Sequence, residues 1–86
     1  MTLMDRHAAA VIDEAQTAQE RYGDFSSTHE AYGVLAEEVA ELLEAVRSND
    51  LLKIGHEARQ VAAVALRLSE HCGRAPEPFR KRSGAK

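Results

Sequence analysis

The chain has 86 residues, of which 44% are hydrophobic, and it contains no Trp and only four aromatic residues. This length supports one small domain, whose core must be built mainly from Ala, Leu, Val and Ile. Fifteen residues are Ala, whereas Gly and Pro together number seven. This composition favours helices and excludes an all-β fold.

The net charge of −3 is divided unevenly along the chain. Residues 73–86 carry five Lys or Arg and one Glu, a charge of +4, whereas residues 1–72 carry six Lys or Arg against 13 Asp or Glu, a charge of −7. A nucleic-acid-binding face concentrates positive charge against phosphates. We therefore expect no direct binding of nucleic acid by the folded part of the chain.

The single cysteine, Cys72, excludes an internal disulfide, and the sequence has no Cys and His spacing typical of a zinc site. No basic segment followed by an apolar run begins the chain, and no stretch approaches the roughly 20 apolar residues that a membrane span needs. The expected location is therefore the cytoplasm, away from the membrane.

Three amphipathic helices are predicted in residues 1–72, each from apolar residues that recur at spacings of four and three. The first begins with a capping box formed by Thr2 and Asp5 and ends at Gly23. Its apolar positions are Met4, Ala8, Val11, Ala15, Ala18 and Tyr22.

The second helix begins at a similar box formed by Ser27 and Glu30, and a polar turn separates it from the third, which Asn49 or Asp50 caps. The apolar positions of the second helix are Ala31, Leu35, Val39, Leu42 and Val46. Those of the third, which ends at Gly73, are Ile54, Ala58, Val61, Ala65, Leu68 and Cys72.

The expected fold is an all-α, three-helix antiparallel bundle over residues 1–72, followed by a basic tail at residues 73–86. The tail combines Pro, Gly and like charges without periodicity, so we expect it to be mobile. Three short helices bury a thin core, and Ala-rich faces let helices approach closely. A second copy of the chain is therefore expected to complete the bundle, in a homodimer or tetramer.

Acidic residues fall inside the apolar stripes of two predicted helices. At about 100° per residue, the apolar neighbours of Glu38 in the second helix lie within about 60° of it, and Glu41 lies at the edge of the stripe. Glu57 has the same position in the third helix, with Gln60 at the edge. If the two helices are antiparallel, these side chains converge on one site.

Such acidic residues have two interpretations. A row of Glu on a helix is usually a solvated face. A carboxylate that faces a dry core is costly unless it is paired or binds a cation, and the placement of two of them in two stripes favours a cation. Oxygen ligands without His or Cys suit Mg²⁺.

Residues that could contact a substrate lie near this predicted site. Lys53, Arg67 and His71 share one edge of the third helix, where they contact phosphate oxygens or simply neutralise the acids. Tyr32 is one of three aromatic residues that flank the first loop, and these rings either stack on a base or close the end of the bundle.

The segment EEVAEL at residues 37–42, followed by EARQ at residues 57–60, resembles the MazG-like all-α nucleoside triphosphate pyrophosphohydrolases. In that superfamily an ExxE motif on one helix and an ExxD motif on the next bind Mg²⁺. The resemblance covers roughly residues 10–72. It implies an Mg²⁺-dependent enzyme that removes unwanted nucleotides by hydrolysing a (d)NTP to a (d)NMP and pyrophosphate.

The resemblance assigns metal ligands by position, and these are Glu38, Glu41, Glu57 and Gln60. Gln60 stands where the family has Asp, so its amide oxygen can coordinate a cation but adds no charge. Glu41 with Glu44 is a competing register, although Glu44 lies about 120° from Glu38 and faces away from the stripe.

The resemblance also implies catalytic roles. Glu38 and Glu41 would act in catalysis as metal ligands. The attacking water would give its proton to Glu37 or to Glu41. Lys53 or Arg67 would stabilise the leaving pyrophosphate. The competing class is a binding or scaffold protein, a helical oligomer with a degenerate site whose basic tail contacts an acidic partner. The Gln at position 60 favours that class, and the glutamates within the stripes oppose it.

Overall fold

The computed structural model describes residues 1–74, which form three α-helices and no strand. These are α1 (Leu3–Tyr22), α2 (Thr28–Ser48) and α3 (Leu51–Gly73). The predicted all-α architecture and the three predicted helices are confirmed. The predicted basic tail lies outside the described residues from position 75 onwards.

Short polar motifs begin the first two helices. Thr2 and Asp5 form the predicted reciprocal box, because each side chain accepts a hydrogen bond from the backbone N–H of the other at 3.0 Å. At α2, Ser27 Oγ accepts from the backbone N–H of Glu30 at 3.0 Å, but Glu30 Oε1 accepts from the N–H of Ser26 at 2.6 Å. The second capping box therefore differs from the prediction, because the Glu30 carboxylate binds the N–H of Ser26 instead of that of Ser27.

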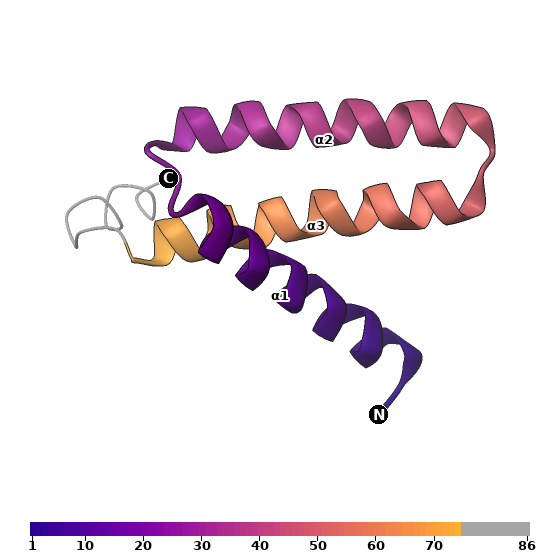
Figure 1. The fold of residues 1–86 in the computed structure, drawn as a ribbon, viewed down its shortest axis with the longest axis horizontal. Coiled ribbons are helices and arrows are strands. Elements are labelled where there is room, and N and C mark those ends of the chain that lie inside the picture. The colour runs from indigo at the N-terminus through magenta and orange to yellow at the C-terminus, as the bar shows by residue number, and fades with distance from the viewer. Residues whose placement is uncertain (75–86) are drawn as a thin grey trace, which may run out of the picture.

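A tight turn joins α2 to α3. Asn49 adopts a left-handed conformation with φ of 59°, which ends α2. Asp50 then caps α3 by accepting a hydrogen bond from the backbone N–H of Lys53 at 3.2 Å. Because the turn is so short, α2 and α3 run antiparallel and side by side as a hairpin (Figure 1).

Helix α1 packs against α3 rather than against α2, and it diverges from the hairpin towards its own N-terminus (Figure 1). The exposed fractions agree, since Met4 is 77% exposed whereas Ala15 is 5% exposed. Helix α3 is therefore the central element, with a neighbour on two sides. This explains why α3 buries Ala63 and Val64, whereas none of the six residues of its predicted apolar stripe is fully buried, and Ala58 and Ala65 are exposed.

The core is small and lies where all three helices approach the loop between α1 and α2. Phe25, from this loop, packs with Ala31 and Val64 in one buried cluster. The partly buried side chains against this cluster are Val34, Leu35 and Leu68. The prediction that Val39 and Val46 are buried is wrong, because each is 47% exposed on the outer side of α2.

Among the described residues, none of the helices has the length and apolar character that crossing a membrane requires.

Candidate metal and substrate site

Three carboxylates from two helices meet between α2 and α3. Glu38, Glu41 and Glu57 each place one carboxylate oxygen within 4.8 Å of the others. Glu38 and Glu41 are one turn apart on α2, and the antiparallel hairpin brings Glu57 of α3 opposite them. The structure thus brings together three of the residues that the sequence predicts as metal ligands.

The carboxylate of Glu38 is the most deeply placed of the three. Its Oε1 atom is buried and has no hydrogen-bond partner, and no other buried side-chain nitrogen or oxygen in residues 1–74 lacks one. Leaving a buried acceptor without a partner costs about 1–3 kcal/mol. An additional group that contacts this oxygen would recover that free energy.

The surroundings of Glu38 disfavour its negative charge. Burial raises the pKa of the Glu38 carboxyl above its ordinary value, and the negative charges of Glu41, Glu57 and Glu37 raise it further. Only His56 opposes this shift, weakly, among the groups that affect this pKa. The site therefore repels an excess of negative charge and attracts a cation.

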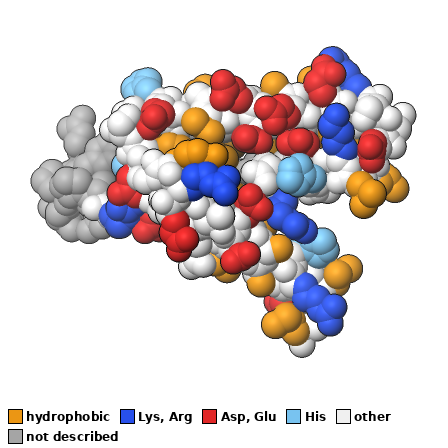
Figure 2. Space-filling model, in the orientation of Figure 1, with side chains coloured by type: hydrophobic (Ala, Val, Ile, Leu, Met, Phe, Trp, Pro, Cys, Tyr) orange, Lys and Arg blue, Asp and Glu red, His pale blue; other side chains and the backbone are white. Residues whose placement is uncertain are grey.

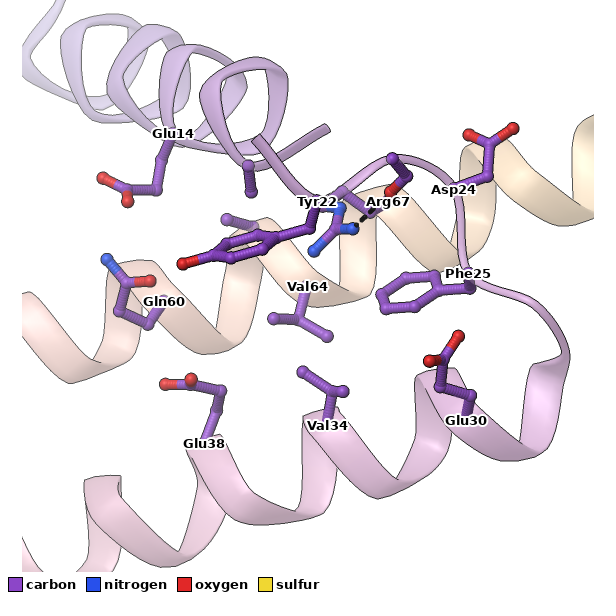
Figure 3. Close-up of a pocket in the computed structure, with 13 residues that line it drawn as sticks. Glu14, Tyr22, Asp24, Phe25, Glu30, Val34, Glu38, Gln60, Val64 and Arg67 are labelled. Atoms are coloured by element: carbon purple, nitrogen blue, oxygen red, sulfur yellow. Dashed lines mark hydrogen bonds between the residues drawn. The ribbon is translucent and has the colours of Figure 1, made fainter. Parts of the chain in front are cut away.

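A cavity of about 370 Å³ extends from Glu38 between the three helices. At its acidic end, Glu38 of α2 and Gln60 of α3 face each other, and Glu14 of α1 points towards both (Figure 3). Its middle wall is apolar, with Val34 and Val64 on facing helices. A volume of this size is typical of small-molecule sites.

Arg67 closes the other end of the cavity. It is only 9% exposed, its Nε donates to Gln19 Oε1 and its Nη2 donates to the carbonyl of Gly23, both at 3.1 Å. Its guanidinium lies 4.3 Å from the centroid of the Phe25 ring. Arg67 follows Glu57 by ten residues, about 15 Å along the helix, so it is not beside the three carboxylates.

The other predicted substrate contacts are not brought together. Lys53 is exposed at the beginning of α3, and Tyr32 is 67% exposed; neither lines the cavity. His71 packs edge-on against Phe25, with ring centroids 6.5 Å apart, and is also outside the cavity lining. Glu37 is exposed and acts on the site only through its charge.

Ten of the thirteen cavity-lining residues were not predicted as site residues, and the acidic ones among them are Glu14, Asp24 and Glu30. The sequence carries a partial signal for Glu14, which lies one turn before the apolar position Ala18 of the same helix. Glu30 was recognised only as a capping residue. Its second role depends on how closely α2 approaches α3, which a local motif does not specify.

No family model matches the chain, and neither the curated proteins nor the solved structures include a match to it.

The arrangement fits a hard divalent cation. Two helices supply three converging carboxylates, one of them with a buried oxygen that has no partner, and oxygen donors of this kind suit Mg²⁺. Acidic side chains gather more widely over α2 (Figure 2), but within residues 1–74 only Glu38 has a buried side-chain oxygen without a hydrogen-bond partner.

Proposed function

We propose that this protein is an Mg²⁺-dependent nucleoside triphosphate pyrophosphohydrolase, which converts a (d)NTP and water to a (d)NMP and pyrophosphate. The observation that carries the proposal is the buried, unpartnered Oε1 of Glu38, which lies beside two further carboxylates at the end of a cavity. The MazG-like resemblance of residues 37–42 and 57–60 supports the same assignment.

Glu38, Glu41 and Glu57 would hold the cation, with Gln60 contributing an amide oxygen from the same end of the cavity. When bound, Mg²⁺ supplies charge neutralisation and Lewis-acid polarisation of phosphate oxygens. Three carboxylates without a cation would instead repel a triphosphate, so the acidic residues serve binding only when their charge is compensated.

The chain also offers a general base. Neither Glu37 nor Glu41 lines the cavity, but Glu41 belongs to the carboxylate cluster whereas Glu37 acts on it only through its charge. Glu14 lines the cavity and points towards Glu38 and Gln60 from α1 (Figure 3). Glu41, beside the proposed cation, or Glu14, inside the cavity, would accept the proton of the attacking water.

The decisive experiment is to incubate the protein with each common NTP and dNTP and Mg²⁺ and to measure pyrophosphate release. Glu38→Gln should lower the rate by about 100-fold or more, because loss of a metal ligand removes several kcal/mol of transition-state stabilisation. Glu44→Gln is the matched control, since Glu44 is an exposed acid on the same helix that lies 3.9 Å from Arg47. Absence of turnover with every nucleotide at high protein concentration would contradict the proposal.

A homodimer or tetramer is part of the proposal. The outer side of α2 carries a second apolar stripe with coiled-coil spacing, and its members are Tyr32, Ala36, Val39, Leu43 and Val46. All five are exposed in the single chain, so a second copy would bury them. Sedimentation equilibrium at micromolar concentration tests this, and a monomer mass would contradict it.

The second candidate is a binding or scaffold protein with a degenerate site, which Gln60 favours because an amide adds no charge to the cation site. Pyrophosphate release distinguishes the two candidates. A scaffold protein would bind Mg²⁺ weakly and release no pyrophosphate from any nucleotide. The proposed enzyme would release pyrophosphate from at least one nucleotide.

A further inference from the structure

The cavity has two chemically different ends. The acidic end contains Glu38 and Gln60, and the other end contains Arg67 and Glu30, with apolar walls between them (Figure 3). Gln60 and Arg67 are seven residues apart on one helix, a distance of about 10 Å along its axis. If phosphates occupy the acidic end, as the proposed function requires, the nucleoside extends along the apolar wall and its base reaches Arg67.

The Arg67 side chain is fixed but retains free donors. Gln19 and Gly23 accept from its Nε and Nη2, and Phe25 supports its guanidinium face. Among residues 1–74 its Nη1 has no hydrogen-bond partner, and this nitrogen is not one of the buried atoms without a partner, so it is accessible from the cavity. In Figure 3 the guanidinium points into the cavity. Within residues 1–74, no carboxylate lies within 4.0 Å of it to compete for these donors.

Glu30 provides an acceptor at the same end. Its Oε1 accepts from the backbone N–H of Ser26 at 2.6 Å and from the Ser26 hydroxyl at 3.1 Å, and Oε2 has no hydrogen-bond partner within residues 1–74. These bonds lower the pKa of Glu30, and the charge of Arg67 lowers it further. Glu30 therefore stays ionised, and it presents an acceptor on the lining of the same end of the cavity as Arg67.

We propose that this end of the cavity selects keto bases, namely guanine, hypoxanthine, uracil and thymine, over the amino bases adenine and cytosine. A keto base has a ring carbonyl beside a ring N–H, so that Arg67 donates to the carbonyl and Glu30 accepts from the N–H. Adenine and cytosine have an amino group beside an unprotonated ring nitrogen, which places donor against donor and acceptor against acceptor. This inference rests on the proposed function for the direction in which the nucleotide lies.

Two substrate pairs test it, because each differs only in this edge. We expect kcat/KM for ITP to exceed that for ATP, and kcat/KM for UTP to exceed that for CTP, by about tenfold to 100-fold in each pair. Equal values within both pairs, or a preference for the amino base, would overturn the inference.

Variants then assign the preference to the residues. Arg67→Lys and Glu30→Gln should each reduce the ITP to ATP ratio at least about fivefold. This ratio does not depend on how much of a variant is folded, because a smaller active fraction lowers both rates equally. Arg59→Lys is the control on the same helix and should leave the ratio unchanged. An unchanged ITP to ATP ratio in both variants would mean that neither residue contacts the base edge, and it would overturn the inference.

Nucleoside binding separates the inference from the proposed function. Inosine and adenosine lack phosphates, so their binding to the base site does not require Mg²⁺. Their binding can therefore be compared by saturation-transfer NMR in the presence of EDTA, which removes divalent cations. Selective binding of inosine without any nucleotide hydrolysis would refute the proposed function and support the base site. Hydrolysis without base preference would support the proposed function and refute the base site, and failure of both measurements would refute both.

Discussion

The two ends of the cavity are opposite in how their charges are satisfied. At one end, Arg67 is buried with its positive charge held by Gln19, the carbonyl of Gly23 and the Phe25 ring. At the other end, Glu38 is half-buried among further negative charges and has an oxygen without a partner. The fold therefore stabilises the positive charge of Arg67 but provides no partner for the buried oxygen of Glu38.

This difference separates a charge whose contacts maintain the fold from a charge that lies among like charges and has an oxygen without a partner. The contacts of Arg67 join α3 to the end of α1 and the loop that follows it, which are more than 40 residues away in sequence. Within residues 1–74, Glu38 forms no hydrogen bond or ion pair that links two segments of the chain. Removal of each charge should therefore change stability in opposite directions.

The largest effect on stability is expected for Arg67→Met. This change keeps much of the apolar stem but removes two hydrogen bonds to a charged donor, and it should lower the free energy of unfolding by about 2–3 kcal/mol. Urea unfolding followed by circular dichroism measures this difference. Arg59→Met, on the same helix, should change it by less than about 0.5 kcal/mol. Equal losses for the two variants would mean that the Arg67 contacts contribute no stability.

A smaller effect is expected for Gln60→Asp. A fourth carboxylate adds charge at the acidic end of the cavity and should tighten Mg²⁺ binding about tenfold, or about 1.4 kcal/mol. Isothermal titration calorimetry measures the affinity. Gln16→Asp adds the same charge on an exposed part of α1 and serves as the control. No change in affinity would place Gln60 outside the reach of the cation.

Glu38→Gln should stabilise the chain in the absence of divalent cations, by up to about 1 kcal/mol at neutral pH. The folded state raises the pKa of Glu38 above its ordinary 4.5, so it binds this proton more tightly than the unfolded state does. The free energy of unfolding contributed by Glu38 therefore falls as pH rises from about 4.5 through the raised pKa, and it is constant above that.

Thermal unfolding of wild type and Glu38→Gln at several pH values in EDTA tests this sign. The difference in Tm should grow as pH rises through that range, and Mg²⁺ should then stabilise the wild type more than the variant. A variant that is less stable than wild type at neutral pH in EDTA would show that Glu38 is satisfied by the fold.

The smallest effect is expected for Arg74→Ala. Arg74 forms ion pairs with Asp24 at 3.0 Å and Glu70 at 2.8 Å, but its side chain is 46% exposed. Exposed pairs contribute little and are screened by salt. We expect Tm to fall by no more than about 3 °C, and by less in 1 M NaCl. A larger loss that persists in salt would contradict this interpretation.

The sequence predicts the helices well because their ends are local. Thr2, Ser27 and Asp50 each cap a helix from within four residues of its first turns, and no distant contact is needed. The position of Glu38 is also local information, since it follows from helical periodicity and the short turn before α3. These two features already place three carboxylates at one point.

The rest depends on contacts that no local pattern encodes. The role of Arg67 requires Gln19 and the carbonyl of Gly23, which are 48 and 44 residues away. Helical periodicity puts Lys53 and Arg67 on one edge, but a separation of 14 residues is more than about 15 Å along the axis, so a shared edge does not bring them to one site. The divergence of α1 from the hairpin, which exposes Met4, is likewise decided by packing.

Two alanines leave α2 no room for larger side chains on its packed side. Ala31 and Ala45 have no exposed surface, and each lies two turns from Glu38, one before it and one after. A single branched side chain at either position would act as a wedge under α2 and shift Glu38 and Glu41 relative to Glu57, although no acidic residue had been altered.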